Sequence, residues 1–241
     1  MSIILTSFTL STLILNTFAA HQINVINRCS ETVWVGTFGD NQIPAGGGFK
    51  LNPGQRQSFS TIDGWTSGRV WGKTGCDSNG NNCVTGNSPP GGRTTLQPVT
   101  LAEFGFDKFM GLDFYDLSLV DGFNLPMAIQ PFGVNLDQNC KLLRCQFNFN
   151  VCPNERNFRQ FDSRGRMVAC NSGCSAKRED KYCCTGPYYN NRDNCQPTEY
   201  SRLFKDQCPD SYSYAYDKKD ADWACKGKSA GSSGYEITFC P

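Results

Sequence analysis

Apolar and polar residues alternate in several short runs along the chain, and alternation with a period of two is typical of half-buried β-strands. These runs are rich in β-branched and aromatic residues, and they cover 23–27, 32–36, 68–72, about 94–104, 114–119 and 235–239. Glycine and proline at 45–48 and 52–54 indicate turns between them. No long amphipathic helix appears in the first half. The pattern therefore predicts a mainly β protein whose core is an antiparallel β-sandwich or flattened barrel.

One main helix is predicted in the second half of the chain, over 197–206. Thr198 is suited to the N-cap, Glu199 to the first turn and Lys205 to the last turn of that helix. The region around it, about 140–208, has short loops, few apolar runs and nine of the 14 cysteines. Because such a segment buries too little apolar surface to fold without cross-links, we expect a disulfide-rich lobe here.

The N-terminal 20 residues carry no charged side chain, and 3–15 are largely apolar. Small residues follow at Thr17, Ala19 and Ala20, which predicts a secretory signal peptide over 1–19 and one domain over 20–241. Cleavage after Ala19 or after Ala20 fits the pattern. A membrane anchor is less favoured because several Ser and Thr interrupt the apolar run. We therefore expect a secreted, extracellular protein with no stable membrane anchor.

The charges nearly balance, with 23 Lys and Arg against 22 Asp and Glu and a formal net charge of +1. This balance argues against a nucleic-acid partner and against a polybasic membrane-surface protein. The single histidine, His21, lies close to the N-terminus, so we expect no histidine inside the domain. A Ser–His–Asp or Cys–His pair and a His-rich zinc site are therefore disfavoured. We expect no cofactor and no metal, and any acid–base chemistry would fall to carboxylates.

All 14 cysteines follow the predicted signal peptide, and an even number in a secreted chain indicates disulfides. Metal binding by Cys170 and Cys174 or by the adjacent Cys183 and Cys184 is the competing interpretation. It is less favoured because adjacent cysteines are awkward ligands for one zinc ion. Spacing alone does not select the pairing among the many that are possible.

Several longer motifs identify a family. They are Ile-Asn-Arg-Cys at 26–29, Gly-Arg-Val-Trp-Gly-Lys-Thr-Gly-Cys at 68–76, Thr-Leu-Ala-Glu-Phe at 100–104, Asp-Phe-Tyr-Asp-Leu-Ser-Leu-Val-Asp-Gly-Phe-Asn-Leu-Pro-Met at 113–127, Tyr-Cys-Cys at 182–184, Pro-Thr-Glu-Tyr-Ser at 197–201, Cys-Pro-Asp at 208–210 and Thr-Phe-Cys-Pro at 238–241. In these motifs and in their order along the mature chain, the sequence resembles thaumatin-like proteins, the pathogenesis-related group 5 family.

The resemblance implies a β-sandwich core, a disulfide-rich lobe with the main helix, and a small third lobe. It also implies seven disulfides: Cys29–Cys240, Cys76–Cys83, Cys140–Cys225, Cys145–Cys208, Cys152–Cys170, Cys174–Cys183 and Cys184–Cys195. One departure from the family pattern is clear, since relatives usually carry a further disulfide shortly after the position of Cys83. Here the loop over 85–92 has no cysteine, and we expect Pro89 and Pro90 to stiffen it instead.

The resemblance also implies a cleft between the sandwich and the disulfide-rich lobe, lined by five charged residues. By motif these are Arg69, Glu103, Asp116, Asp121 and Asp217, with Asp210 as the rival of the last. Carboxylates accept hydrogen bonds from sugar hydroxyls, and a pair of them can hydrolyse a glycosidic bond. If the protein is an enzyme, Glu103 is the expected acid and Asp121 the nucleophile or base. The aromatic residues Phe114, Tyr115 and Phe123 are alternative sugar contacts, although core positions are more usual for them.

The resemblance implies a secreted defence-type protein, which we expect to be a monomer. Its expected partner is the polysaccharide β-1,3-glucan of fungal cell walls, and its expected activity is antifungal. A weak endo-β-1,3-glucanase that uses the same carboxylates is the first alternative. A hydrolase inhibitor, a sweet-tasting receptor ligand and a purely structural extracellular protein remain open as further alternatives.

Overall fold

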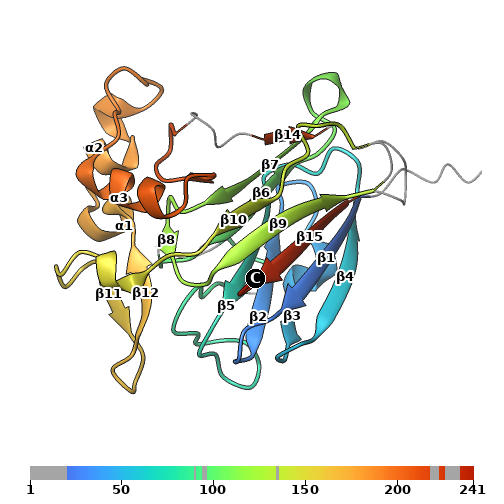
Figure 1. Ribbon diagram of the computed structural model, residues 1–241, viewed down its shortest axis with the longest axis horizontal. Coiled ribbons are helices and arrows are strands. Elements are labelled where there is room, and N and C mark those ends of the chain that lie inside the picture. The colour runs from blue at the N-terminus through green and yellow to red at the C-terminus, as the bar shows by residue number, and fades with distance from the viewer. Residues whose placement is uncertain (1–20, 90, 94–96, 134–135, 218–222, 226–233) are drawn as a thin grey trace, which may run out of the picture.

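The computed structural model describes residues 21–89, 91–93, 97–133, 136–217, 223–225 and 234–241, and the predicted signal peptide lies outside these residues. In the described part, two β-sheets pack face to face, and a lobe beside them carries the helices (Figure 1). The predicted mainly β sandwich with a helix-bearing lobe is confirmed. No helix of the described part is long and apolar enough to cross a membrane.

One sheet of the sandwich contains both ends of the domain. Its strand order is β10 (Leu143–Cys145), β9 (Met127–Phe132), β15 (Gly234–Phe239), β1 (His21–Asn27) and β4 (Arg56–Thr61). All neighbours in it are antiparallel except β1 and β15, which run parallel. A parallel pair needs a long crossover connection, and here the rest of the domain supplies it.

The other sheet carries the candidate site. Its order is β13 (Ser211–Tyr212), β7 (Asp113–Ser118), β6 (Leu101–Gly105), β5 (Gly68–Lys73), β2 (Val33–Phe38) and β3 (Gly48–Leu51), and β14 (Trp223–Cys225) also pairs with β7. Strand β6 begins later than the pattern predicted. Pro98 has no N–H for a strand ladder, and the N–H of Thr100 donates to the side chain of Asn124. Residues 94–96 of that prediction lie outside the described residues.

The core lies between the two sheets because alternate residues of each strand point inward. Ile23 and Val25 of β1 are fully buried, as are Val70 of β5 and Leu117 of β7. At one end of the sandwich the core is aromatic. Neighbouring ring centroids there lie 5.1–6.0 Å apart among Trp65, Phe104, Phe106, Tyr115 and Tyr235.

The lobe has a small sheet of its own, β11 (Arg159–Phe161), β12 (Met167–Asn171) and β8 (Gly122–Phe123). Its helices are α1 (Gly173–Lys177), α2 (Asp180–Cys183) and α3 (Glu199–Gln207). The predicted helix is confirmed as α3, which begins with a capping box between Thr198 and Ser201. Helices α1 and α2 span too few residues to give a periodic pattern. Short 3-10 turns lie at Pro44–Gly47, Phe109–Gly111, Phe149–Val151 and Gly186–Tyr188.

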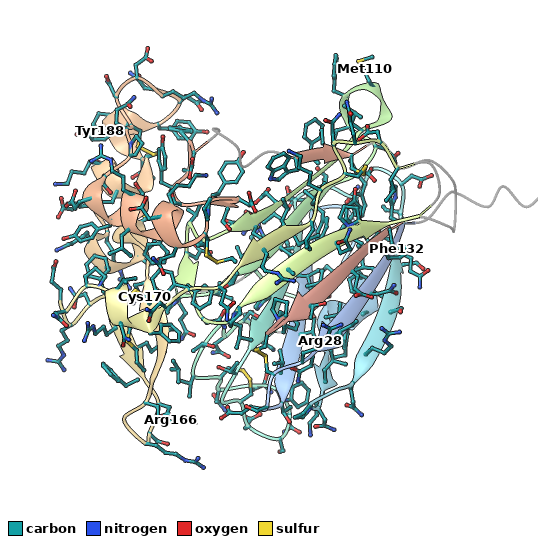
Figure 2. All side chains as sticks on the ribbon, in the orientation of Figure 1. Arg28, Met110, Phe132, Arg166, Cys170 and Tyr188 are labelled. Atoms are coloured by element: carbon teal, nitrogen blue, oxygen red, sulfur yellow. A yellow bond between two sulfur atoms is a disulfide. The ribbon has the colours of Figure 1, made fainter. Side chains whose placement is uncertain are left out.

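All cysteines are paired, and Figure 2 shows the disulfides as yellow bonds. The pairs are those that the family resemblance implies: Cys29–Cys240, Cys76–Cys83, Cys140–Cys225, Cys145–Cys208, Cys152–Cys170, Cys174–Cys183 and Cys184–Cys195. The last three lie wholly within the lobe, where apolar residues are scarce, and Cys145–Cys208 joins β10 of the sandwich to the end of α3. These cross-links therefore supply stability that a small core alone would not provide.

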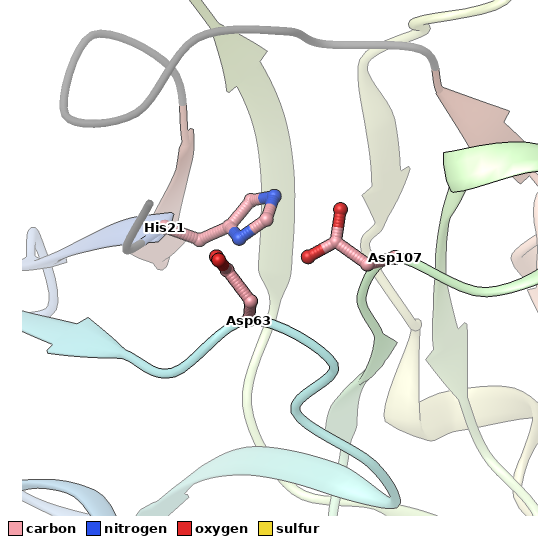
Figure 3. Close-up of side chains that lie close together, drawn as sticks. All are labelled: His21, Asp63 and Asp107. Atoms are coloured by element: carbon pink, nitrogen blue, oxygen red, sulfur yellow. The ribbon is translucent and has the colours of Figure 1, made fainter. Parts of the chain in front are cut away.

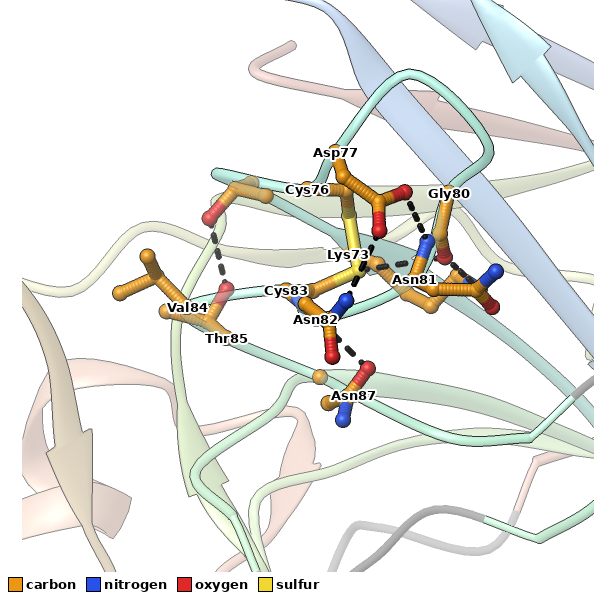
Figure 4. Close-up of a disulfide and its surroundings, with 12 residues drawn as sticks. Lys73, Cys76, Asp77, Gly80, Asn81, Asn82, Cys83, Val84, Thr85 and Asn87 are labelled. Carbon is orange, nitrogen blue, oxygen red and sulfur yellow. Dashed lines mark hydrogen bonds between the residues drawn. A yellow bond between two sulfur atoms is a disulfide. The ribbon is translucent and has the colours of Figure 1, made fainter.

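The loop after β5 corresponds to the third lobe, and Figure 4 shows how it is held. The Cys76–Cys83 disulfide closes it, and Asp77 Oδ1 accepts from the N–H groups of Asn79 and Asn81 at 2.9 Å. Buried Lys73 donates to the carbonyl of Gly80 at 2.9 Å. Burial lowers the pKa of Lys73, and the charge of Asp77 opposes that shift.

Beyond Cys83, where the family's extra disulfide is missing, side-chain hydrogen bonds hold the loop. Asn87 Oδ1 accepts from the N–H of Cys83 at 3.2 Å, and the indole N–H of Trp71 donates to the carbonyl of Gly86 at 3.0 Å. Pro90 lies outside the described residues.

Candidate functional site

Three of the predicted site residues form a row across neighbouring strands. Arg69 of β5 stands opposite Glu103 of β6, which stands opposite Asp116 of β7. Residues directly opposite each other on paired strands share one face of the sheet. The next residues along, Val70, Ala102 and Leu117, are in register with one another and fully buried on the core face. Period-two alternation therefore directs the three charged side chains to the outer face.

Arg69 and Glu103 form an ion pair, with 2.8 Å between Arg69 Nε and Glu103 Oε1. Both side chains are about a quarter exposed, at 28% and 26%. A partly exposed pair of this kind adds at most about 1 kcal/mol to stability. Its main effect is on orientation, because the guanidinium fixes the direction of the carboxylate.

Asp121 lies near these three residues and comes from the turn between β7 and β8. Strand β8 pairs with β12 of the lobe, and Ser175 Oγ of α1 donates to the carbonyl of Asp121 at 3.0 Å. The turn needs glycine at 122, where φ is 117° and a Cβ would lie 2.4 Å from the carbonyl oxygen of Cys170. Asp121 therefore sits at the junction of sandwich and lobe.

Together Arg69, Glu103, Asp116 and Asp121 line a cavity of about 280 Å³, which lies near the lower end of the range for small-molecule sites. The remaining lining residues are uncharged: Leu101, Ser118, Val120, Tyr212 and Ala215. Three carboxylates and one guanidinium leave an excess of negative charge. The cavity therefore disfavours anionic ligands and suits ligands that donate hydrogen bonds.

Asp217, the fifth residue predicted for the site, is not among the residues that line this cavity. Asp217 is 7% exposed and accepts from the N–H and the hydroxyl of Ser213 at 2.9 and 2.7 Å. Lys205 Nζ lies 3.2 Å from the same carboxylate oxygen. Asp217 thus closes the turn that holds Tyr212 and Ala215 on the cavity wall. The rival, Asp210, does not line the cavity either.

The aromatic residues considered as alternative sugar contacts also lie outside this cavity. Tyr115 and Phe123 are core residues, 1% and 0% exposed, and Phe114 does not line the cavity. The aromatic residue that does line it, Tyr212, was not predicted. Its place depends on the parallel pairing of β13 with β7, which brings Tyr212 opposite Ser118. No local sequence pattern signals a two-residue strand.

Other cavities are larger but differ in charge. One of about 590 Å³ is lined by three acidic and three basic residues, Glu31, Asp77, Asp162, Lys50, Arg164 and Arg166. Another, of about 440 Å³, has two arginines and one glutamate among its lining residues, Arg28, Arg166 and Glu31. An excess of carboxylates distinguishes the smaller cavity from both.

Comparison with known proteins agrees with the fold. The model of the Thaumatin family matches residues 27–241. Pathogenesis-related protein 5 of Arabidopsis thaliana is 43% identical over 224 residues, which are 89% of this chain and 88% of that protein. A Prunus avium protein named glucan endo-1,3-beta-glucosidase is 41% identical over 245 residues, 96% of each chain.

A solved structure adds a likeness of fold alone. The laminaripentaose-producing β-1,3-glucanase, solved in complex with laminaritetraose, aligns with a TM-score of 0.56 at 12% identity. The alignment covers 91% of this chain and 98% of the glucanase.

Proposed function

We propose that this chain, which belongs to the thaumatin family, is a secreted, monomeric defence-type protein that binds fungal β-1,3-glucan in its carboxylate-lined cavity. The observation that carries the proposal is the row of Arg69, Glu103 and Asp116 across three strands, with Asp121 added at the junction with the lobe. Seven disulfides support secretion, because disulfides persist in oxidising compartments. Antifungal activity would follow from wall binding.

The cavity chemistry suits a neutral sugar. Carboxylates accept hydrogen bonds from hydroxyl groups, and Arg69 has guanidinium N–H donors for ring or hydroxyl oxygens. Leu101, Val120 and Tyr212 offer apolar surface to the C–H faces of a pyranose. The excess of carboxylates works against sulfated, phosphorylated or uronic polysaccharides. A cavity of about 280 Å³ encloses a short stretch of chain, and the rest of a glucan would lie along the rim.

Hydrolysis of the same polysaccharide is the second candidate, favoured by the Prunus avium relative that is named as a glucanase. Glu103 would then be the acid and Asp121 the nucleophile or base. Glu103 Oε1 lies 2.8 Å from Arg69 Nε, in an ion pair. Hydrolysis needs two carboxylates at a defined separation on either side of the scissile bond, whereas binding does not, so binding is proposed first.

The substitutions Glu103→Gln and Asp121→Asn test the proposal. Both keep the size of the side chain and remove its charge. A hydrogen bond to a charged group is worth about 1.5–3 kcal/mol, so each change is expected to weaken glucan affinity about tenfold to a hundredfold. The measurement is pull-down and titration with linear β-1,3-glucan, with reducing-end release assayed in the same samples.

Glu155→Gln is the matched control, because Glu155 also pairs with a basic residue, Lys177, but does not line the cavity. It is expected to bind glucan as the unaltered protein does. A catalytic pair would lose far more turnover than binding, which separates the two candidate functions. Unchanged binding and hydrolysis in both cavity variants, with unchanged circular dichroism, would remove the cavity from the proposal.

A further inference from the structure

The single histidine lies inside the domain, contrary to the sequence-based expectation. His21 begins β1 and is 8% exposed. Its ring stacks on Phe106 with centroids 4.2 Å apart, and its Nε2 lies 2.9 Å from Asp113 Oδ2. The first residue of a strand is buried here because the neighbouring β4 and the segment after β6 cover it.

Asp113 holds the ring in one orientation. This carboxylate is 3% exposed and also accepts from the hydroxyl of Tyr235 at 3.1 Å and from the N–H of Asp107 at 3.1 Å. As an acceptor it binds the Nε2–H of a neutral imidazole, which leaves the lone pair of that tautomer on Nδ1. A carboxylate behind one ring nitrogen is also the usual support for a histidine that binds metal through the other.

The other nitrogen, Nδ1, is buried without a hydrogen-bond partner, and the imidazole lies beside two further carboxylates. Figure 3 shows the imidazole of His21 together with the side chains of Asp63 and Asp107. One potential ligand atom from each of the three residues lies within 4.8 Å of the others. Asp63 follows β4, and Asp107 follows β6, so three separate segments converge here. The N–H of Gly64 donates to Asp107 Oδ2 at 3.2 Å and ties two of these segments together.

We propose that His21 Nδ1, Asp63 and Asp107 bind a divalent cation of the zinc class, with water in the remaining position. An imidazole nitrogen with carboxylate oxygens suits Zn²⁺, whereas Ca²⁺ and Mg²⁺ prefer oxygen ligands throughout. Tetrahedral ligands about 2.0–2.2 Å from zinc stand about 3.3–3.6 Å apart. The three ligand atoms therefore need to move toward one another by little more than an ångström. Asp107 can supply part of this movement by rotation, because its side chain is exposed.

The local charge favours a cation at this position. Burial lowers the pKa of His21, but the hydrogen bond and charge of Asp113 and the charges of Asp107 and Asp63 outweigh it, so the pKa is raised. The carboxylates that hold a proton on the ring would equally attract a metal ion. The proposed site differs from the His-rich zinc site that the sequence disfavours, because it uses only one histidine. None of its residues lines the cavity proposed to bind glucan, so the two sites are tested independently.

The test is calorimetric titration of the full secreted protein, freed of metal, with ZnCl₂ near neutral pH. One zinc ion per chain is expected to bind. Asp107→Asn and Asp63→Asn are each expected to weaken binding at least about tenfold, by analogy with the effect of changes around metal ligands. Asp121→Asn, a matched change in the glucan cavity, is expected to leave zinc binding unaltered. Titration with MgCl₂ is expected to show no comparable affinity.

Thermal unfolding gives a second readout that needs no calorimetric heat, since a ligand that binds the folded state raises Tm. Zinc is expected to raise the Tm of the unaltered protein and not that of Asp107→Asn. The proposal is overturned if the unaltered protein binds no zinc at concentrations up to about 1 mM, about −4 kcal/mol in binding free energy. It is overturned equally if both carboxylate variants bind zinc as the unaltered protein does. In either case His21 serves only as an ion-pair partner of Asp113.

Discussion

At the scale of single residues, Asn124 joins segments that are far apart in the sequence. Its side-chain amide donates to the carbonyl of Gly72 and to Thr85 Oγ1, each at 2.8 Å. Its Oδ1 accepts from the N–H groups of Thr100 and Leu125 at 3.0 and 2.8 Å. Asn124 is only 4% exposed, so water cannot replace these partners. It ties the loop that lacks the family's extra disulfide to the sheet.

We therefore expect Asn124→Ala to cost at least about 3 kcal/mol of unfolding free energy, because several buried polar groups lose their partners at about 1–3 kcal/mol each. The measurement is urea unfolding followed by tryptophan fluorescence. Asn139→Ala, at an exposed position, is the control and is expected to change stability by less than about 0.5 kcal/mol. A loss below about 1 kcal/mol for Asn124→Ala would show that the loop is held by other contacts.

The family resemblance implied four of the residues that line the candidate cavity, but not their neighbours. Arg69, Glu103 and Asp116 lie on strands that alternate clearly, and strand alternation fixes which face a side chain takes. The role of Asp217 was not predictable, because its partner Lys205 lies on α3 and the contact depends on how the helix packs. The burial of His21 was missed for the same reason. Asp113, its partner, is brought to it by packing between two sheets.

At the scale of elements, the turn from β7 to β8 decides where Asp121 lies. Gly122→Ala combines a left-handed φ of 117° with a Cβ 2.4 Å from a carbonyl oxygen, so the backbone must move. We expect a loss of about 2–4 kcal/mol in unfolding free energy and weaker glucan binding, measured by urea unfolding and by glucan titration.

The matched control for this turn is Gly54→Ala. Gly54 also has a positive φ, 77°, but no atom lies within 4 Å of the Cβ that would be added. It is expected to cost only about 1 kcal/mol, the penalty for the backbone conformation itself, and to leave glucan binding unchanged. Equal losses in the two variants would mean that the close approach to Cys170 is relieved without cost.

The elements that the sequence predicted are those with a strong local pattern, namely β1, β2, β5, β6, β7, β15 and α3, although β6 begins later than predicted. Strands β10, β11, β13 and β14 have two or three residues each and exist because a neighbouring strand pairs with them. Strand β9 was missed although it is longer, because it is buried at Met127, Ala128 and Ile129 in succession and shows no alternation there. Tertiary pairing overrides local propensity at such positions.

At the scale of the whole molecule, the two ends of the domain lie side by side. Strands β1 and β15 pair in parallel from Gln22 with Gly234 to Asn27 with Phe239. Cys29 and Cys240 follow these strands and are joined by a disulfide across a sequence separation of 211 residues. Cys76–Cys83 closes the shortest loop of the seven disulfides, with a separation of 7 residues. These two disulfides allow the effect of loop length to be tested in one protein.

Replacing both cysteines of Cys29–Cys240 by alanine is expected to destabilise the protein by about 5 kcal/mol. The same change at Cys76–Cys83 is expected to cost about 2.5 kcal/mol. Both values follow from the loop-closure entropy of the unfolded chain, which grows with loop length. Urea unfolding of the two double variants measures the difference. Glucan binding is expected to persist in both wherever they remain folded, since none of these four cysteines lines the carboxylate cavity. If the short loop proves as costly to open as the long one, then local contacts around Lys73 and Asp77, rather than chain entropy, determine the contribution of these disulfides.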